Sequence, residues 1–143
     1  MIKTFRGLLA DGGEDRIRLS TNNGLTGYKI VKFQILTAEP YGGASGEHIV
    51  QLTSQSQTPT ADVTFENPLL LGVAIINNAT AGYQYGSIPV VIFDNTVINQ
   101  DMFVSHVDNA SAQKCNYYIE LEKVKLDINE ATVATLKDMR GRE

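Results

Sequence analysis

The sequence predicts an all-β fold, an antiparallel β-sandwich of jelly-roll type that ends in one short α-helix. Three observations support this prediction. Apolar and polar residues alternate with a period of two in many short segments, which is typical of strands with one buried face. Clusters of Gly, Asn, Asp and Pro separate these segments at the spacing found in sandwiches and jelly rolls. Only the C-terminal segment has the apolar spacing of a helix.

The composition is that of one ordinary globular domain. The chain has 143 residues, of which 43% are hydrophobic and 20% are charged, and a single core can cover this length. We expect a sandwich over residues 1–126 and, in the same domain, a helix with its tail over residues 127–143. A net charge of -4 without a cluster of Lys and Arg argues against nucleic acid as a partner. The longest apolar run, Leu69 to Ile76, is too short to cross a membrane.

The N-terminal segments predict a β-hairpin. Ile2 to Leu9 and Asp15 to Ser20 are candidate strands. The turn Asp11-Gly12-Gly13 lies between them, and its glycines can adopt the positive φ that a tight turn needs. We therefore expect these two strands to pair.

The remaining strands are predicted from the same alternation. They are Tyr28 to Leu36, Glu47 to Thr53, Ala61 to Phe65, Leu69 to Ile76, Ile88 to Phe93, Met102 to Val107 and Tyr117 to Leu126. The run from Leu69 is continuously apolar, which predicts a strand buried on both faces. A buried helix is the alternative, but Gly72 and the β-branched residues favour a strand.

The core is predicted from the faces of these strands. In the strand that begins at Tyr28, the odd-numbered residues form the apolar face, and the other strands are treated in the same way. The predicted core consists of Val31, Phe33, Ile35, Val63, Phe65, Leu70, Val73, Ile75, Val91, Phe93, Ile119 and Leu121.

The C-terminal segment predicts a short helix over Asp127 to Arg140. Asp127 and Glu130 stand in the spacing of a capping box, and no Gly or Pro follows until Gly141. One face would carry Ile128, Thr132, Leu136 and Met139. We expect this stripe to pack on the sandwich rather than on a partner.

The polar residues predict no catalytic site, no cofactor and no metal site. The only histidines, His48 and His106, are far apart in sequence and lack the spacing that places two ligands on one side of an element. Asp94, Asp101, His106 and Asp108 could surround calcium, but turn capping is the favoured interpretation because no EF-hand spacing occurs. Cys115 has no C-x-x-C partner, and we expect it to act as a small buried hydrophobe. We therefore expect a protein that is not an enzyme.

Three tyrosines are candidate partner-binding residues. Tyr83 and Tyr85 stand in a polar loop that contains glycine, and Tyr41 begins a glycine turn. An aromatic ring gains little in such a loop unless it packs against something. Partner binding by Tyr41, Tyr83 and Tyr85 is one interpretation, and packing of these rings over their own core is the other.

Four segments spread over the chain carry a resemblance to a known class of proteins. They are Lys3 to Ala10, Gly27 to Phe33, Val91 to Asn95 and Asn116 to Glu122. The chain resembles small virion structural proteins of marine tailed bacteriophages. The resemblance implies a structural protein of the particle, such as a head decoration or cement protein, made in the host cytoplasm and located in the virion.

A domain without a catalytic site can contribute to a particle only by burying surface against its neighbours, and this argument predicts the partners. They are copies of the same chain, in a homo-oligomer such as a trimer, and the major capsid protein or other virion proteins. The alternative is a carbohydrate-binding β-sandwich module, in which the three tyrosines would stack on sugar rings, although the lack of tryptophan argues against it. A small β-fold enzyme has the least support, because no titratable groups converge in the sequence pattern.

Overall fold

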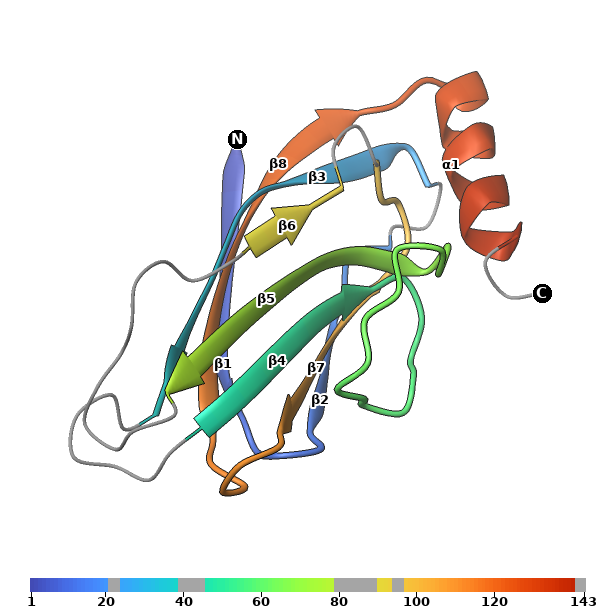
Figure 1. Cartoon of the computed structure of the whole chain (residues 1–143). Helices are drawn as coiled ribbons and strands as arrows, with labels where there is room; N and C mark the ends of the chain where they lie inside the picture. Colours follow the sequence, from blue (N-terminus) through green and yellow to red (C-terminus); the bar gives the residue numbers. More distant parts are fainter. Residues whose placement is uncertain (21–23, 39–45, 79–89, 94–96, 141–143) are drawn as a thin grey trace.

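The structure is a computed structural model of the whole chain, and it describes residues 1–20, 24–38, 46–78, 90–93 and 97–140. Strands and a final helix follow one another along these residues (Figure 1). They are β1 (Ile2–Leu9), β2 (Glu14–Ile17), β3 (Thr26–Thr37), β4 (Gly46–Thr53), β5 (Leu70–Asn78), β6 (Val90–Ile92), β7 (Met102–Asp108), β8 (Cys115–Lys125) and α1 (Ile128–Arg140). The prediction of a mostly β fold with one C-terminal helix is confirmed.

The strands form two antiparallel sheets with the strand orders β1-β8-β3 and β2-β7-β4-β5-β6. Strands near the start of the chain pair with strands near its end, and strands nearer the middle pair with each other. Thus β1 pairs with β8, β2 with β7 and β4 with β5. This order arises when one long hairpin rolls into two facing sheets, and it is the order of a jelly roll. Only β6 departs from it among the described strands, since it bonds to β5 rather than to β3. Figure 1 shows β6 between these two strands.

The turn after β1 carries the chain from one sheet to the other. Gly12 has a φ of 78°, and its N–H donates to the carbonyl of His106 on β7 at 2.9 Å. Leu9 and Ile17, each 4% exposed, face the core from opposite sheets. The prediction that the first two strands pair is therefore wrong. The glycines specify a reversal of direction, whereas burial of the apolar faces selects the partner strand.

An irregularity in β3 changes which of its side chains are buried. The register with β8 shifts at Val31, and an extra residue in one strand interrupts the alternation of faces. Val31 is 43% exposed, whereas Phe33 and Ile35, after the shift, are 3% and 4% exposed. Tyr28, before the shift, is also buried at 4% exposed. The core prediction is thus confirmed for Phe33 and Ile35 and wrong for Val31.

The connection between β4 and β5 covers the outer face of β4, and it contains no strand. The side-chain amide of Gln51 donates to the carbonyls of Thr60 and Asp62 at 3.1 and 3.0 Å. These bonds attach the segment to the sheet through a side chain instead of a backbone ladder. The predicted strand Ala61 to Phe65 is therefore wrong, and Phe65 is 60% exposed.

Some of the other predicted core residues are buried and some are exposed, depending on the face of the strand on which each one lies. Leu70, Val73, Ile119 and Leu121 are buried, as predicted. Val63 and Phe93 are partly buried. Ile75 and Val91, each 37% exposed, are wrongly placed in the core. Val91 lies opposite Val73 on the short strand β6, which is the edge strand of its sheet and is hydrogen-bonded to β5 alone among the described strands.

The helix begins with the predicted capping box. The N–H of Glu130 donates to Asp127 Oδ1 at 2.7 Å, and the N–H of Asp127 donates back to Glu130 Oε1 at 3.5 Å. The predicted packing stripe is wrong, because Ile128 is 75% exposed and Leu136 is 47% exposed. Within the described residues, no helix has the length and apolar character needed to span a membrane.

The helix instead packs through small residues. Ala131 and Ala134 are buried, and Asn99 Nδ2 donates to the carbonyl of Ala131 and to Thr135 Oγ1 at 3.3 and 2.9 Å. Small side chains let the helix approach Asn99, so a polar contact replaces the apolar stripe. The side chain of Met139 lies outside the described residues.

Candidate functional site

The predicted partner-binding residues Tyr41, Tyr83 and Tyr85 lie outside the described residues. One surface of the described residues that could bind a partner is a groove of about 1020 Å³ along β3, β6, β8 and part of β1. Its lining includes five apolar side chains that are at least partly exposed. They are Leu8, Val31, Leu36, Val90 and Ile92. We call this surface the flank groove.

The flank groove exists because of two local features of the strands. The register shift in β3 turns Val31 outward. Leu36 lies four residues after Lys32, where the shift ends, and it is 45% exposed. On the other side, β6 bonds to β5, so Val90 and Ile92 line the groove opposite β3. Exposed apolar side chains gathered in this way are a common feature of surfaces that bind other proteins.

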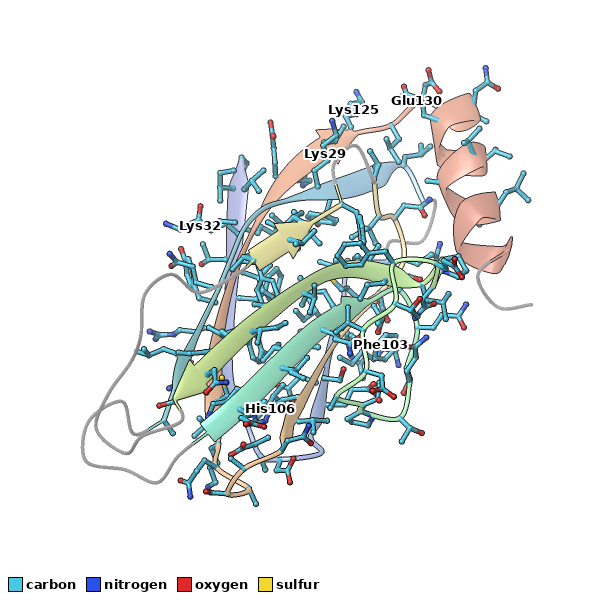
Figure 2. The ribbon with its side chains drawn as sticks, viewed as in Figure 1. Lys29, Lys32, Phe103, His106, Lys125 and Glu130 are labelled. Carbon is cyan, nitrogen blue, oxygen red and sulfur yellow. The ribbon has the colours of Figure 1, made fainter. Side chains whose placement is uncertain are left out.

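Polar and charged side chains border the flank groove. Arg6, Lys32 and Gln34 contribute to its lining. Lys32 lies opposite Glu120 in the register of β3 and β8, and Lys29 lies opposite Glu122. Figure 2 shows Lys29 and Lys32 along β3. An apolar centre with a polar border is the usual composition of a protein interface.

Tyr118 lies in this border and holds a carboxylate. Its hydroxyl donates to Glu120 Oε2 at 2.7 Å, and this hydrogen bond raises the pKa of Tyr118 above its ordinary value. The tyrosine therefore stays neutral and keeps its proton in the bond at ordinary pH. Tyrosine residues with an apolar ring and a polar tip are frequent in interfaces.

The acidic residues that could have surrounded calcium do not come together. Asp101 and Asp108 lie at opposite ends of β7, and Asp94 lies outside the described residues. Asp101 Oδ1 accepts from the amides of Leu19 and Ser20 at 2.9 and 3.0 Å. Asp101 therefore caps the backbone of a distant segment, the residues that follow β2, instead of a turn of its own.

Asp101 also pairs with Arg16, whose Nε donates to Asp101 Oδ2 at 2.7 Å. Burial alone would raise the pKa of Asp101. The hydrogen bonds from the amides of Ser20 and Leu19 and from Arg16 outweigh that effect and lower the pKa to about 2. The carboxylate is therefore a structural anchor that stays charged over the whole ordinary pH range.

Asp108 anchors the opposite end of β7. It accepts from the amides of Glu47, Ala110 and Gln113 at 2.9, 2.9 and 2.7 Å. Burial raises the pKa of Asp108, but these hydrogen bonds outweigh it and bring the pKa below its ordinary value. The turn-capping prediction is confirmed for Asp108, because two of these amides belong to the connection that directly follows it.

The two histidines, which the sequence separates, meet inside the sandwich together with Cys115. His48 Nδ1 and His106 Nε2 are 2.8 Å apart, and the rings stack with centroids 5.1 Å apart. One ring nitrogen of each histidine and the sulfur of Cys115 all lie within 4.8 Å of one another. Each of the three residues is at most 1% exposed. We call these residues the interior cluster; Figure 2 labels His106 within the sandwich.

Burial determines the charge states of the interior cluster. It lowers the pKa of His48, against the opposing effect of Asp108. It raises the pKa of Cys115 to about 12. His48 is therefore neutral and Cys115 is a thiol at neutral pH.

The sequence could not reveal the interior cluster through spacing, because its members come from three strands. One indication was present in the sequence, namely which residues share a face of the strand because they are two positions apart. His48 alternates with the apolar Val50 and Leu52 on β4, and His106 alternates with Val104 on β7. This alternation places each histidine on a core face, but the register that brings Val50 opposite His106 appears only in the structure.

Comparison of the chain with protein-family models and with curated proteins finds no match. Among solved structures, the unassembled pentamer of Merkel cell polyomavirus VP1 is similar over 85% of this chain and 94% of that chain. The TM-score is 0.49 and the sequence identity is 9%. The jelly-roll fold is assigned from the strand pairing of this chain and not from that likeness.

Proposed function

We propose that this protein is a non-enzymatic structural component of a virion, a capsid decoration or cement protein of a tailed bacteriophage. It acts through protein–protein interfaces, binding copies of itself and a neighbouring capsid subunit. The observation that carries the proposal is the flank groove, an apolar surface with a polar border on the side of a jelly roll. Jelly rolls are a common architecture of viral capsid domains and also of lectins.

Because jelly rolls occur both in capsid proteins and in lectins, the sequence resemblance is the reason for preferring a role in the virion. Its four segments include much of β1, β3 and β8, the strands of one sheet. That sheet supplies most of the side chains that line the flank groove. The part of the chain that carries the resemblance is thus also the part that presents the candidate interface.

The proposed partner surface can be tested by a double substitution of Val31→Asp and Leu36→Asp. Both side chains are about half exposed, so the fold should tolerate the change while the apolar centre of the interface is lost. The matched control is Ile75→Asp, an exposed β-branched residue on β5 that does not line the groove. We expect the parent to form a homo-oligomer, most simply a trimer, and to bind purified particles of the phage that encodes it.

The measurements are native mass spectrometry and a particle-binding assay, with peptide mass spectrometry of purified particles to detect the chain. The double variant should bind about 30-fold more weakly, which corresponds to about 2 kcal/mol for loss of a hot spot. The control should match the parent. A monomeric parent that is missing from particles, and that binds a glycan through Tyr83 and Tyr85, would replace this proposal with the carbohydrate-binding alternative.

A further inference from the structure

The interior cluster gathers every histidine and cysteine of the chain. The sequence contains two histidines and one cysteine, and the fold brings all three to one point from β4, β7 and β8. The cluster connects the two sheets, because β4 and β7 belong to one sheet and β8 belongs to the other. Thiolate and imidazole are the side chains that soft and borderline metal ions prefer.

The hydrogen bonds of His106 orient its ring for metal binding. His106 Nδ1 lies 3.0 Å from the carbonyl oxygen of Ala10. A carbonyl can only accept, so Nδ1 carries the proton and Nε2 of a neutral ring carries a lone pair. That lone pair points to the centre of the cluster, where His48 Nδ1 lies. A second hydrogen bond that fixes the tautomer in this way usually accompanies a histidine ligand.

A buried hydroxyl next to Cys115 provides an independent observation. Thr37 lies directly opposite Cys115 in the register of β3 and β8, and it is 3% exposed. Its Oγ1 finds no hydrogen-bond partner among the described residues. Directly opposite residues of an antiparallel pair have Cβ atoms about 5 Å apart on one face. The hydroxyl therefore stands beside the thiol, where it can hold a water molecule or contact a bound ion.

We propose that His48, His106 and Cys115 bind one Zn²⁺ ion, which joins the two sheets of the sandwich. On binding, the Cys115 thiol loses its proton to solvent and a zinc–sulfur bond forms. Without the ion, His48 Nδ1 donates its proton to the lone pair of His106 Nε2. On binding, His48 releases that proton to solvent and takes up one on Nε2, so that Nδ1 can bind the ion. A fourth ligand, a water molecule held by Thr37, completes a tetrahedron.

The geometry requires only small movements. Tetrahedral zinc with bonds of about 2.0 Å to nitrogen and about 2.3 Å to sulfur needs ligand nitrogens about 3.3 Å apart and sulfur about 3.6 Å from each. The two ring nitrogens lie 2.8 Å apart, so they must separate by about 0.5 Å. One ring nitrogen of each histidine lies within 4.8 Å of the sulfur, so the approach that the sulfur needs is on the order of 1 Å.

A zinc ion would also serve the fold. The chain has a single cysteine and so cannot form an internal disulfide, and a structural metal can stabilise a small domain through its binding energy. The site lies where the turn after β1 meets β7, since the carbonyl of His106 accepts from Gly12 N–H. The ion would therefore hold β4, β7 and β8 together beside this turn.

The test measures zinc in the full chain after expression with zinc and dialysis against metal-free buffer. We expect one zinc per chain and a melting temperature that falls when a strong chelator is added. Titration of the apo protein with Co²⁺ should give a cobalt–thiolate absorption band in the near ultraviolet. Cys115→Ser should abolish the band and weaken zinc binding at least tenfold, and His48→Gln should weaken it to a similar extent.

The matched control is Val104→Ala on β7. Val104 is buried on the same face as His106, so its truncation destabilises the core without removing a ligand. It should lower the melting temperature while keeping one zinc and the cobalt band. A parent with no stoichiometric zinc, no cobalt–thiolate band and no response to chelator would overturn the proposal, even if every variant fails to fold. Zinc that survives unchanged in Cys115→Ser would overturn it equally.

Discussion

The two ends of β7 both hold a buried carboxylate that accepts hydrogen bonds from backbone amides, and they differ in the side chains that lie beside it. At the first end, Asp101 keeps a full charge and is surrounded by donors, including the half-exposed Arg16. At the other end, Asp108 is charged as well, but the neighbouring His106 faces the interior beside His48 and Cys115. The carboxylates accept hydrogen bonds from connecting segments at the edge of the sandwich, whereas the imidazoles and the thiol are buried between its two sheets. A polar residue in a core is therefore explained by its bonding partners and not by burial alone.

The largest expected effect is at the Asp108 end. Asp108→Ala removes the acceptor of three backbone amides, those of Glu47, Ala110 and Gln113, and leaves partly buried donors without a partner. We expect a loss of about 3 kcal/mol in the free energy of unfolding. Chemical denaturation measures it. Asp108→Asn keeps one acceptor oxygen and should lose less; equal losses in the two variants would contradict this explanation.

A smaller effect is expected from pH at the Asp101 end. The pKa of Asp101 is lowered from 3.8 to about 2 in the folded state. A lowered pKa stabilises the fold above the unfolded pKa, and that stability is lost as the pH falls from about 4 through about 2. The shift corresponds to about 2 kcal/mol.

Asp101→Asn tests this pH dependence directly. The variant should be less stable than the parent at pH 7 and should show a flatter fall in stability between pH 4 and pH 2. Thermal unfolding at a series of pH values measures both. A variant whose acid profile overlies that of the parent would assign the acid sensitivity to other carboxylates, Asp108 among them.

Removing the cation of the same pair should matter less. The side chain of Arg16 is 55% exposed, and exposed ion pairs contribute little because water screens the charges. Asp101 also retains its bonds to Leu19 and Ser20. We expect Arg16→Ala to cost roughly 0.5 kcal/mol. A loss as large as that of Asp101→Asn would show that the ion pair, rather than the backbone bonds, holds this end.

Local sequence patterns predicted most strands because alternation reports a half-buried face directly. The segment Ile2 to Leu9 became β1 with the same bounds, and the capping box at Asp127 marked the start of α1. Pairing was not predictable in the same way. The turn at Gly12 fits a hairpin as well as a crossing between sheets, and only the burial of Leu9 and Ile17 from opposite sides selects the second.

The candidate sites were less accessible to sequence reasoning than the strands. Val31 lines the flank groove because the register of β3 shifts by one residue. No local pattern of residues predicts this shift. His48, His106 and Cys115 meet because of the registers of two sheets. A residue's face can be predicted from its own strand, whereas a site made by several strands requires their relative positions.

The last prediction compares two buried threonines at the two ends of the sandwich, and its smallest effect is expected at Thr37. Thr53 lies opposite Phe103, near the Asp101 end, and its Oγ1 donates to the carbonyl of Gln55 at 2.7 Å. Thr37 lies opposite Cys115, at the interior cluster, and its Oγ1 has no partner among the described residues.

Valine has nearly the same shape as threonine and no hydroxyl. In zinc-free protein, Thr37→Val should therefore leave the free energy of unfolding unchanged or raise it by up to about 1 kcal/mol, because it removes an unsatisfied buried group. Thr53→Val should lower it by about 1 kcal/mol, because it breaks a bond that is made. Urea denaturation of both variants in the presence of a chelator gives the comparison. If Thr37→Val proves as costly as Thr53→Val, the hydroxyl of Thr37 has a partner in solution, and its place beside the proposed zinc site must then be explained by that bond.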